Sequence, residues 1–481
     1  MEWIVVGAYV GALFFIFLFS VGQLRLAWHY KRVKKNKKEE PSSLHNYPIV
    51  TIQLPVYNER YVVERLIESV ANIQYPKDKL EIQVLDDSTD ETLDIVSTQV
   101  LKYQQAGYDI KHVKRDNREG FKAGALKHGL TLAKGEFLAI FDADFLPKKD
   151  FLEKTIPYFI DEKIGVVQTR WGHINQDYSP LTKLQAFGLD AHFTVEQSGR
   201  SQAGSFINFN GTAGVWRKTC IEEAGGWSAD TLTEDLDLSY RAQLKGWQFK
   251  FVEDVVAPAE LPVIMPAIKS QQYRWNKGAA ETARKNLWKV LISNIGWEHK
   301  VHATFHLLNS SVFLMLLLAA ILSVPVLYIK DSFPELQQLF NLGSVFILGF
   351  FCIGIFYWTS TKAIHKTNYK QYFFTNFPLF LTFSMGLSLH NSIAVSEGLL
   401  GYKTPFIRTP KFNVFKSADK WQNNKYIKNK LGISSILEGL LCLYFIFGIA
   451  SGFLVEDYGL LIFHVMLALG YGTIFYYSVK H

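Results

Sequence analysis

The sequence predicts a Rossmann-like α/β domain inserted between transmembrane helices. Its 481 residues are 48% hydrophobic, which is too apolar for one soluble domain, yet 20% are charged, which is too many for a pure membrane bundle. Long apolar stretches lie near both ends of the chain, and between them short apolar runs alternate with helical patterns. This alternation is typical of α/β domains, so two kinds of structure share the chain.

Residues 1–28 are predicted to form an N-terminal transmembrane helix, followed by a basic linker over residues 29–47. The stretch from Trp3 to Leu24 is almost uncharged and long enough to cross a bilayer. A cleaved signal peptide would carry its basic residues before the apolar stretch, whereas here they follow it. The positive-inside rule therefore places the N-terminus outside and the linker in the cytoplasm.

The net charge of +7 does not predict a nucleic-acid partner. The basic residues concentrate beside apolar segments rather than across one soluble face, so membrane topology explains them better. The three cysteines, Cys220, Cys352 and Cys442, lie far apart and lack metal-ligand spacing. Neither a disulfide framework nor a zinc site is indicated.

Residues 48–302 are predicted to form the α/β domain, on the cytoplasmic side. Apolar runs at residues 49–54, 81–85 and 137–141 are typical of buried strands, and residues 62–73 are typical of a helix. Acidic pairs follow two of these strands. Open α/β sheets bind their ligands at the carboxyl ends of strands, so these pairs mark the expected site.

Residues 303–481 are predicted to form a C-terminal membrane domain with its C-terminus inside. Its spans are expected at about 303–328, 342–360, 433–454 and 460–477. The apolar segment 372–396 has basic residues on both sides, so a span there would leave one basic loop on the wrong face. We expect an interfacial or re-entrant helix there instead, followed by a cytoplasmic loop over about 403–420.

The first acidic pair, Asp86-Asp87, could accept hydrogen bonds from a nucleobase or a ribose hydroxyl. Taken alone, two aspartates before Ser88-Thr89 are more typical of a simple turn. The second set, Asp142 and Asp144, offers the hard oxygen ligands that Mg²⁺ or Mn²⁺ bind together with substrate phosphates. A solvated acidic turn is the alternative, but the buried strand directly before these residues favours a ligand site.

Thr233-Glu234-Asp235 opens an amphipathic stretch that runs to Leu244. Thr233 or Glu234 could simply cap this helix. A rigid carboxylate is also what a general base requires, and Asp235 is the candidate.

Gln271, Arg274 and Trp275 lie within one helical motif, Gln-Gln-Tyr-Arg-Trp. Helical spacing brings them near one face, which combines a guanidinium that can bind diphosphate with an indole on which a sugar ring can stack. An interfacial helix with its Trp and Arg at the lipid headgroups is the alternative, and both interpretations are compatible. The four motifs in this order indicate transfer of a sugar from a nucleotide donor.

The chain resembles family 2 glycosyltransferases of the cellulose synthase superfamily, most closely the cellulose-synthase-like A and C branch that makes β-1,4-linked mannan, glucomannan and glucan backbones. Beyond the four motifs, the resemblance rests on five further runs at residues 53–59, 84–90, 118–126, 209–216 and 222–227. It covers about residues 48–285, and the membrane part more loosely. It implies a GT-A type (Rossmann-like) domain between transmembrane helices.

The resemblance implies a role for each matching residue. Asp235 is expected to be the catalytic base, and Asp142 with Asp144 to hold the metal. Donor binding is expected from Asp86, Asp87, Lys122, Asp142, Gln271, Arg274 and Trp275. Acceptor binding is expected from Asn210, Gly211, Thr212, Glu234 and Trp275. Phe406, Thr409 and Lys411 match a gating loop that closes over the nucleotide, although Arg408 stands where the family has a small apolar residue.

The expected function is that of a hexosyltransferase in a multi-pass membrane protein, in the plasma or inner membrane if the source is bacterial. It would be inverting and processive, would need Mg²⁺ or Mn²⁺, and would transfer hexose from GDP-mannose or UDP-glucose to a growing β-1,4-linked polysaccharide that it passes through the bilayer. A single base without a second nucleophile implies one displacement at the anomeric carbon. The alternatives are a non-processive transferase acting on ceramide or diacylglycerol, and a carbohydrate-binding protein with an inactive domain.

Overall fold

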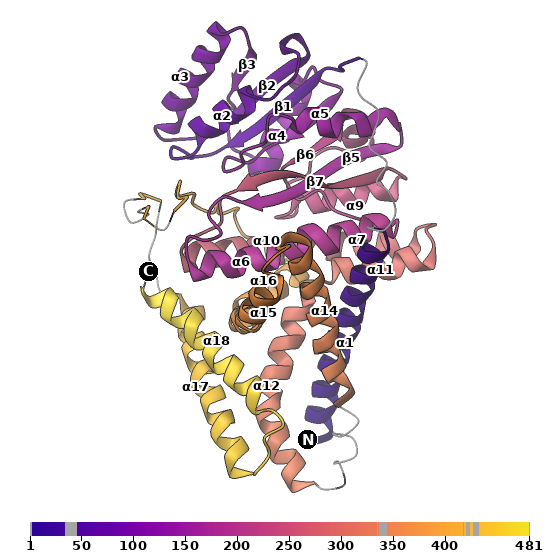
Figure 1. Cartoon of the computed structure of the whole chain (residues 1–481), viewed down its shortest axis with the longest axis vertical. Helices are drawn as coiled ribbons and strands as arrows, with labels where there is room; N and C mark the ends of the chain where they lie inside the picture. The colour runs from indigo at the N-terminus through magenta and orange to yellow at the C-terminus, as the bar shows by residue number, and fades with distance from the viewer. Residues whose placement is uncertain are drawn as a thin grey trace.

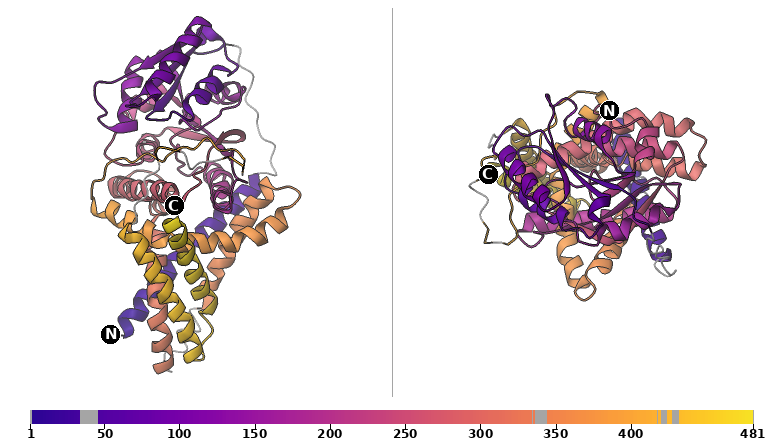
Figure 2. Two further views of the ribbon diagram at one scale, coloured as in Figure 1. Left: turned by 90° about the vertical axis from the view of Figure 1, so that its left-hand side faces the viewer. Right: turned by 90° about the horizontal axis from the view of Figure 1, so that it is seen from above.

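The computed structural model describes residues 2–33, 46–333, 335, 344–416, 418–419, 424–426 and 432–480. An α/β domain lies above a bundle of long helices, and α1 begins at the end of the bundle farthest from the α/β domain (Figure 1). The left view in Figure 2 shows the same two layers, with the sheet domain above the bundle.

The α/β domain is built on a seven-stranded sheet of order β3-β2-β1-β4-β6-β5-β7. Strands β1 to β4 are mutually parallel neighbours, β6 is antiparallel to both β4 and β5, and β7 is parallel to β5. The strands are β1 (Val50–Val56), β2 (Leu80–Asp86), β3 (Asp109–Val113), β4 (Phe137–Ile140), β5 (Ile164–His173), β6 (Gly214–Arg217) and β7 (Gln248–Ala259). The chain moves outward from β1 to β2 and β3, then returns to β4 on the other side of β1, which creates a switch point between β1 and β4.

Both faces of this sheet are covered, because its strands are apolar on both sides. Side chains of β4 alternate between two cores: Phe137 and Ala139 pack into one, Leu138 and Ile140 into the other. The covering helices of the domain are α2 (Val63–Ala71), α3 (Thr92–Gln105), α4 (Phe121–Leu132), α5 (Phe151–Thr155), α6 (Pro180–Ala191), α7 (Gln197–Gln202), α8 (Lys218–Glu223), α9 (Glu234–Leu244) and α10 (Met265–Ile292). Short 3-10 turns cover Lys77–Lys79 and Ile156–Ile160, and a π-turn covers His192–Glu196.

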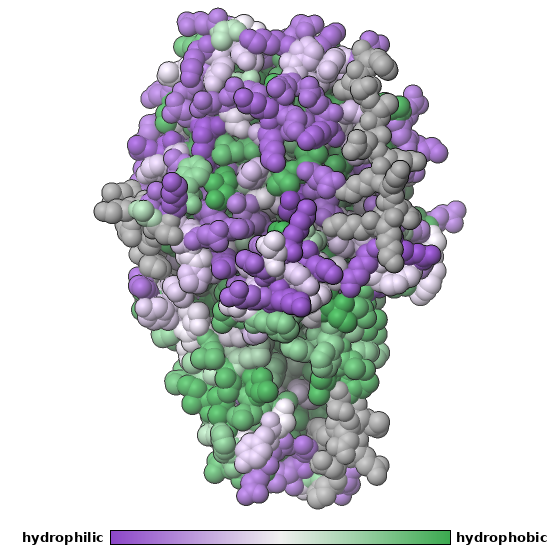
Figure 3. Space-filling model, in the orientation of Figure 1, coloured by the Kyte–Doolittle hydropathy of each residue, from purple (hydrophilic) through white to green (hydrophobic). Residues whose placement is uncertain are grey.

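In the described part of the chain, five helices are long and apolar enough to cross a membrane. They are α1 (Glu2–Val33), α12 (Ser311–Ser332), α14 (Ile347–Ile364), α17 (Ile433–Leu454) and α18 (Leu461–Lys480), with a 3-10 turn at Ser344–Phe346 before α14. On the face that Figure 3 shows, hydrophobic residues cover much of this bundle below the polar α/β domain. The length and composition of these helices are consistent with an integral membrane protein.

The helix boundaries correct several expected ones. The span expected at 303–328 is interrupted, because α11 (Trp297–Leu307) ends before a polar turn at Asn309 and Ser310, and the apolar helix α12 begins only at Ser311. Helix α1 continues to Val33, five residues beyond the expected end, and so takes up the first part of the predicted linker. Residues 34–45 of that linker lie outside the described residues.

The segment expected as one helix over 372–396 consists of two, α15 (Tyr369–Gly386) and α16 (Ser388–Leu400), bent by 51°. Gly386 packs so closely on α18 that a Cβ there would lie 2.4 Å from the Gly470 carbonyl oxygen. Gly398 likewise lies against α10, where a Cβ would approach the Lys277 oxygen to 2.6 Å. These close approaches place α10, which carries the Gln-Gln-Tyr-Arg-Trp motif, directly on the membrane helices.

Candidate active site

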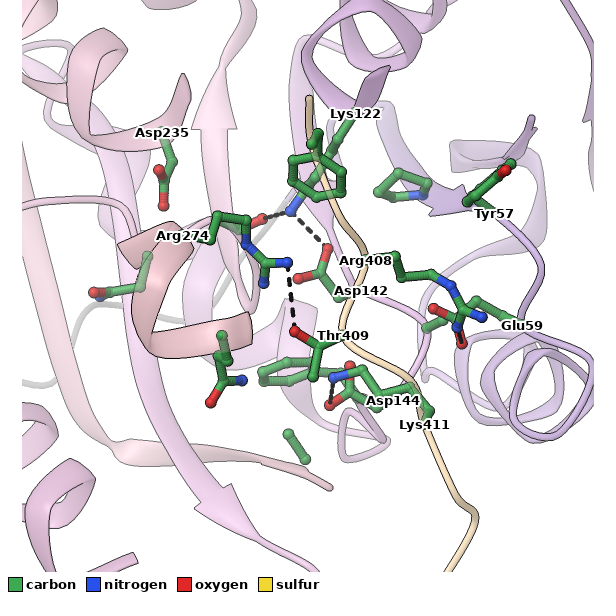
Figure 4. A pocket seen from close by; sticks show the side chains of 18 of the residues that line it. Tyr57, Glu59, Lys122, Asp142, Asp144, Asp235, Arg274, Arg408, Thr409 and Lys411 are labelled. Carbon is green, nitrogen blue, oxygen red and sulfur yellow. Dashed lines mark hydrogen bonds and ion pairs between the residues drawn. The ribbon is translucent and has the colours of Figure 1, made fainter. Parts of the chain in front are cut away.

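One cavity lies at the carboxyl ends of β1, β2 and β4, beside the switch point of the sheet (Figure 4). It is lined by residues at the carboxyl ends of these strands, by the N-terminal part of α9, by α10 and by the loop after α16. The titratable lining residues are Tyr57, Glu59, Asp87, Arg118, Lys122, Asp142, Asp144, His173, Glu234, Asp235, Glu260, Arg274, Arg408 and Lys411. Segments that are more than 300 residues apart in the chain meet here.

The structure brings Asp87 to the cavity but not Asp86. Asp86 is the last residue of β2, and successive side chains of a strand point to opposite faces. Its carboxylate accepts hydrogen bonds from the Ser88 backbone nitrogen at 2.9 Å and faces His112 Nε2 at 2.8 Å, in a buried position. Asp87 lines the cavity, where Arg115 Nε donates to it at 2.9 Å. The expected donor contact of Asp86 is therefore not supported by its position.

Asp142, Ala143 and Asp144 all line the cavity, and Ala143 also packs against the core. Lys122 Nζ lies 2.6 Å from Asp142 Oδ1, and Lys411 Nζ lies 2.8 Å from Asp144 Oδ2. Across the described residues, no cluster of three or more His, Cys, Asp or Glu side chains is arranged for a metal ion. Two carboxylates suit Mg²⁺ or Mn²⁺ when phosphate oxygens and water complete the shell, so this pair fits a metal that arrives with a diphosphate.

Lys122 links the acidic groups of the cavity. It lies in the first turn of α4, after Gly120 and Phe121, which both adopt left-handed backbone angles. Its Nζ donates to the Gly211 carbonyl oxygen at 2.8 Å and lies 3.8 Å from Glu234 Oε1. Burial acts to lower the pKa of Lys122, but the carboxylates of Asp142 and Glu234 outweigh it, so that the pKa is raised. The ammonium group therefore remains charged beside the acidic residues.

Asp235 lies in the first turn of α9 with its carboxyl group in the cavity. Burial raises the pKa of Asp235 to about 7, with a further increase from Glu234 that Lys122 partly offsets. Gly211 lies against this carboxyl group with φ +77°, and a Cβ on it would be 3.1 Å from Asp235 Oδ2. Only glycine combines that backbone conformation with that approach. A carboxyl group with a pKa near neutrality is suited to accept a proton.

Not all of the residues expected to bind the acceptor reach the cavity. Asn210, Gly211 and Glu234 line the cavity. Thr212 is fully buried, does not line it, and accepts a hydrogen bond from the Asp142 backbone nitrogen at 2.9 Å through Oγ1. Its position fits support of the Asp142 turn rather than the acceptor contact that was expected.

Gln271, Arg274 and Trp275 of α10 all line the cavity. The helix reaches it because Gly278 packs on Thr233, where a Cβ would lie 2.5 Å from Thr233 Cγ2. Arg274 Nη1 donates to the Ile407 carbonyl oxygen at 3.2 Å and lies 3.5 Å from Thr409 Oγ1. The guanidinium thus faces both the acidic site and the loop after α16.

The expected gating-loop residues also reach the cavity. The Phe406 ring stacks on that of Phe121 at 5.9 Å, and the Arg274 guanidinium lies 4.9 Å from its centroid. Arg408, between Phe406 and Lys411, forms an ion pair with Glu59 at 2.8 Å.

Several lining residues were not expected from the sequence. Trp171 and His173 are two positions apart on β5, so their side chains lie on the same side of the strand. The ring centroids of Trp171 and Trp275 are 6.4 Å apart. Glu260 follows the last strand of the sheet. Arg118 covers the Tyr57 ring at 3.3 Å. The two-residue period of β5 could have placed Trp171 and His173 on one side of a strand from the sequence alone. The other positions depend on tertiary contacts, which no local pattern shows.

Residues 48–286 match the family model described as Glycosyltransferase like family 2. The probable glucomannan 4-beta-mannosyltransferase 4 of Oryza sativa subsp. japonica is 41% identical over 346 residues, which cover 66% of this chain and 62% of that protein. Glucomannan 4-beta-mannosyltransferase 1 of Cyamopsis tetragonoloba is 45% identical over 259 residues, which cover 53% and 49%. The chain thus spans about half to three fifths of the length of these relatives.

Among solved structures, the fold is similar to that of the mannosyltransferase PcManGT from Pyrobaculum calidifontis in complex with GDP-Man and Mn²⁺. The TM-score is 0.57 at 20% identity, over 82% of this chain and 100% of that one. This likeness concerns the fold, which includes the mixed sheet and the adjoining helices.

Proposed function

The chain is a member of glycosyltransferase family 2, matched over residues 48–286, and on that premise we propose that it is a membrane-embedded, inverting and processive β-glycosyltransferase. It extends a β-1,4-linked polysaccharide from a nucleotide-activated hexose and passes the product through its own membrane helices. The donor is GDP-mannose or UDP-glucose. The names of the relatives make mannose the first sugar to test.

The observation that carries this proposal is the meeting of five distant segments in one cavity. Asp87, the Asp142 and Asp144 pair, Asp235 and Arg274 all line it, together with the loop that holds Lys411. Each group supplies a different need of sugar transfer: contact with the nucleoside, a grip on the diphosphate, a base and cations for the leaving group.

The reaction we propose is one displacement at the anomeric carbon. Asp235 takes the proton from the acceptor hydroxyl, whose oxygen forms the new bond to the anomeric carbon as the bond to the diphosphate breaks. The electron pair of the broken bond leaves with the diphosphate, and the Arg274 guanidinium and the Lys411 ammonium stabilise its charge. Inversion follows because the acceptor attacks the face opposite to the leaving group.

Asp142 and Asp144 would hold a divalent cation together with the diphosphate. Such a cation supplies charge neutralisation of the leaving group. Among the described lining residues, seven carboxylates (Glu59, Asp87, Asp142, Asp144, Glu234, Asp235 and Glu260) outnumber five lysines and arginines (Arg118, Lys122, Arg274, Arg408 and Lys411). Burial raises the pKa of Glu59 and of Asp235 to about 7, so part of this excess is uncharged near neutral pH. Asp142 and Asp144 are the carboxylates whose repulsion of a diphosphate a divalent cation would offset.

The position of the site on the membrane helices supports processive synthesis. Helix α10 carries Trp275 into the cavity and packs on α16, which belongs to the bent helix pair. A polymer leaving the acceptor end of the cavity would meet these helices first. We propose that the catalytic domain faces the cytoplasm, where nucleotide sugars are available.

The test is to incubate membranes that contain the protein with radiolabelled GDP-mannose or UDP-glucose and to digest the product with linkage-specific glycosidases. We expect a polymer from one donor that a β-1,4-specific enzyme degrades. A product of one sugar on a lipid would instead favour the lipid glycosyltransferase.

A further inference from the structure

The loop of residues 402–411, called the lid loop below, carries positive charge into a cavity that already contains positive charge. Arg408 and Lys411 of the lid loop line the cavity together with Arg118, Lys122 and Arg274. Arg408 lies close enough to Arg118 to reduce its pKa further, after the larger effect of burial. The lid loop can close only if carboxylates offset this repulsion.

Two of the three cations of the lid loop, Arg408 and Lys411, each meet a carboxylate near the carboxyl end of a strand. Lys411 Nζ lies 2.8 Å from Asp144 Oδ2, and Arg408 Nη1 lies 2.8 Å from Glu59 Oε2 (Figure 4). The side chains of Arg408 and Glu59 are only 14% and 8% exposed, so water screens their attraction less than at the surface. The Arg408 guanidinium also covers the Tyr426 ring at 4.4 Å, and the Tyr426 hydroxyl donates to the Asp90 carboxylate.

The two ion pairs differ in what donor binding requires of them. Asp144 is a proposed metal ligand, so Lys411 must give up this partner when a metal diphosphate enters and can then turn to the phosphates. Glu59 lies three residues after the end of β1, on the opposite side of the cavity from Asp235, and has no role in the proposed reaction. The Arg408–Glu59 contact is thus the one that can persist through donor binding.

The two ends of the lid loop are fixed by separate contacts. Gly401 ends α16 with φ +83°, a conformation that suits glycine. On the other side, Glu260 Oε1 accepts hydrogen bonds from the backbone nitrogens of Phe412 at 2.7 Å and Asn413 at 3.0 Å. The segment between these anchors has no helix or strand in the described residues, so side-chain contacts decide where it lies.

We propose that Arg408 and Glu59 are a positioning pair that holds the lid loop over the donor site and thereby sets the affinity for the donor. The inference rests on the proposed function, because it takes the cavity as a nucleotide-sugar site.

The expected change in donor affinity follows from the fraction of molecules in which the lid loop is closed over the site. A ligand that requires the closed lid loop binds more weakly in proportion to the fraction of protein that is closed. If loss of the pair leaves about a tenth of the molecules closed, the Kd for nucleotide rises about tenfold. Loss of the second partner then adds little, because the contact is already absent.

The test uses the full-length protein in detergent at pH 8, where Glu59 is ionised, and measures binding of GDP and of UDP in the presence of Mg²⁺ by calorimetry. The variants are Arg408→Val, Glu59→Gln, the double variant, and Arg408→Lys, which keeps the charge. Arg60→Val is the matched control, since Arg60 neighbours Glu59 but pairs with Glu91 near the surface. We expect an increase in Kd of about tenfold in each single variant and no more in the double variant, with substantial recovery in Arg408→Lys and no change in the control.

A second measurement reports the lid loop directly. Thr409 is 2% exposed in the closed arrangement, so a cysteine placed there should react slowly with maleimide without nucleotide, after subtraction of the parent protein's labelling. Arg408→Val and Glu59→Gln should each accelerate the reaction, and Arg60→Val should not. Equal labelling rates, or losses of affinity that multiply to about a hundredfold in the double variant, would overturn the pair.

These outcomes separate the inference from the proposed function. A protein that binds neither nucleotide in any variant contradicts the proposed function, while the labelling rates still decide whether the pair holds the lid loop. If Glu59→Gln does not fold, the comparison of Arg408→Val with Arg408→Lys decides it, because Arg408 belongs to the loop and not to the core.

Discussion

Two walls of the same cavity are held in place by different means. One wall, called the sheet wall below, carries Asp142 just after the end of β4 and Asp235 in the first turn of α9. Backbone hydrogen bonds and two apolar cores fix these two segments. The lid loop, with Thr409 and Lys411, is held by contacts of its side chains with Arg274 and Asp144. Under the proposed function, residues of the sheet wall perform the chemistry and the lid loop retains the donor.

The largest effect is expected at the sheet wall, from Asp235→Asn. The variant should fold and bind donor, but transfer should fall by about 10³-fold or more, because proton removal from the acceptor is lost. Initial rates with labelled donor, together with donor binding, check this. Asp230→Asn serves as control, since Asp230 is a largely exposed partner of Lys285. Turnover at the wild-type rate in Asp235→Asn would remove it from the mechanism.

Removal of the metal should have a comparable effect on the same wall. Treatment with EDTA should stop transfer, and added Mg²⁺ or Mn²⁺ should restore it in the wild type but not in Asp144→Ala, which lacks an oxygen ligand. The measurement is transfer rate against free metal concentration. Full activity in EDTA would refute the assignment of Asp142 and Asp144.

Loss of the lid loop should do less to the chemistry than loss of Asp235. Replacement of residues 406–411 by a flexible linker should weaken donor binding by about tenfold, through loss of closure. Chain synthesis should fall more, about a hundredfold, because Lys411 also faces the leaving diphosphate. Donor affinity and the rate of chain synthesis are measured on one preparation. If both fall by the same factor, the lid loop acts through donor binding alone and Lys411 has no part in the chemical step.

The smallest expected effect is a pH dependence. Asp235 acts only when ionised, and burial raises its pKa to about 7, so kcat/KM should rise with pH and be about tenfold higher at pH 8 than at pH 6. Burial also raises the pKa of Glu59 to about 7, so Glu59→Gln is measured in parallel, and the dependence that remains belongs to Asp235. A flat profile in that variant would contradict the assigned base.

The sequence predicted the sheet wall better than the lid loop, for a physical reason. Strand patterns locate Asp87 and Asp142 at strand ends, because local apolar runs determine where strands stop. The same alternation could have separated Asp86 from Asp87, since neighbours on a strand face opposite ways. The contact between Arg408 and Glu59 joins residues 349 positions apart, and no local pattern contains it.

The membrane part shows the same limit of local patterns. Apolar length predicted α17 over Ile433–Leu454, since few polar residues interrupt it. The bent pair α15 and α16 packs closely on its neighbours at Gly386, against Gly470, and at Gly398, against α10, and hydropathy does not report such contacts. The position of the lid loop is determined by its contacts with the α/β domain, which are distant in the sequence.

The central claim is that this cavity adds sugars repeatedly to one chain, and a pulse-chase measurement tests it most directly. Full-length protein is given labelled donor briefly, then an excess of unlabelled donor, and the products are sized by chromatography. The account predicts that the label moves into progressively longer polymer in the wild type and that no labelled product forms in Asp235→Asn. Label that remains in a single-sugar lipid product, or transfer that persists in Asp235→Asn, would contradict it.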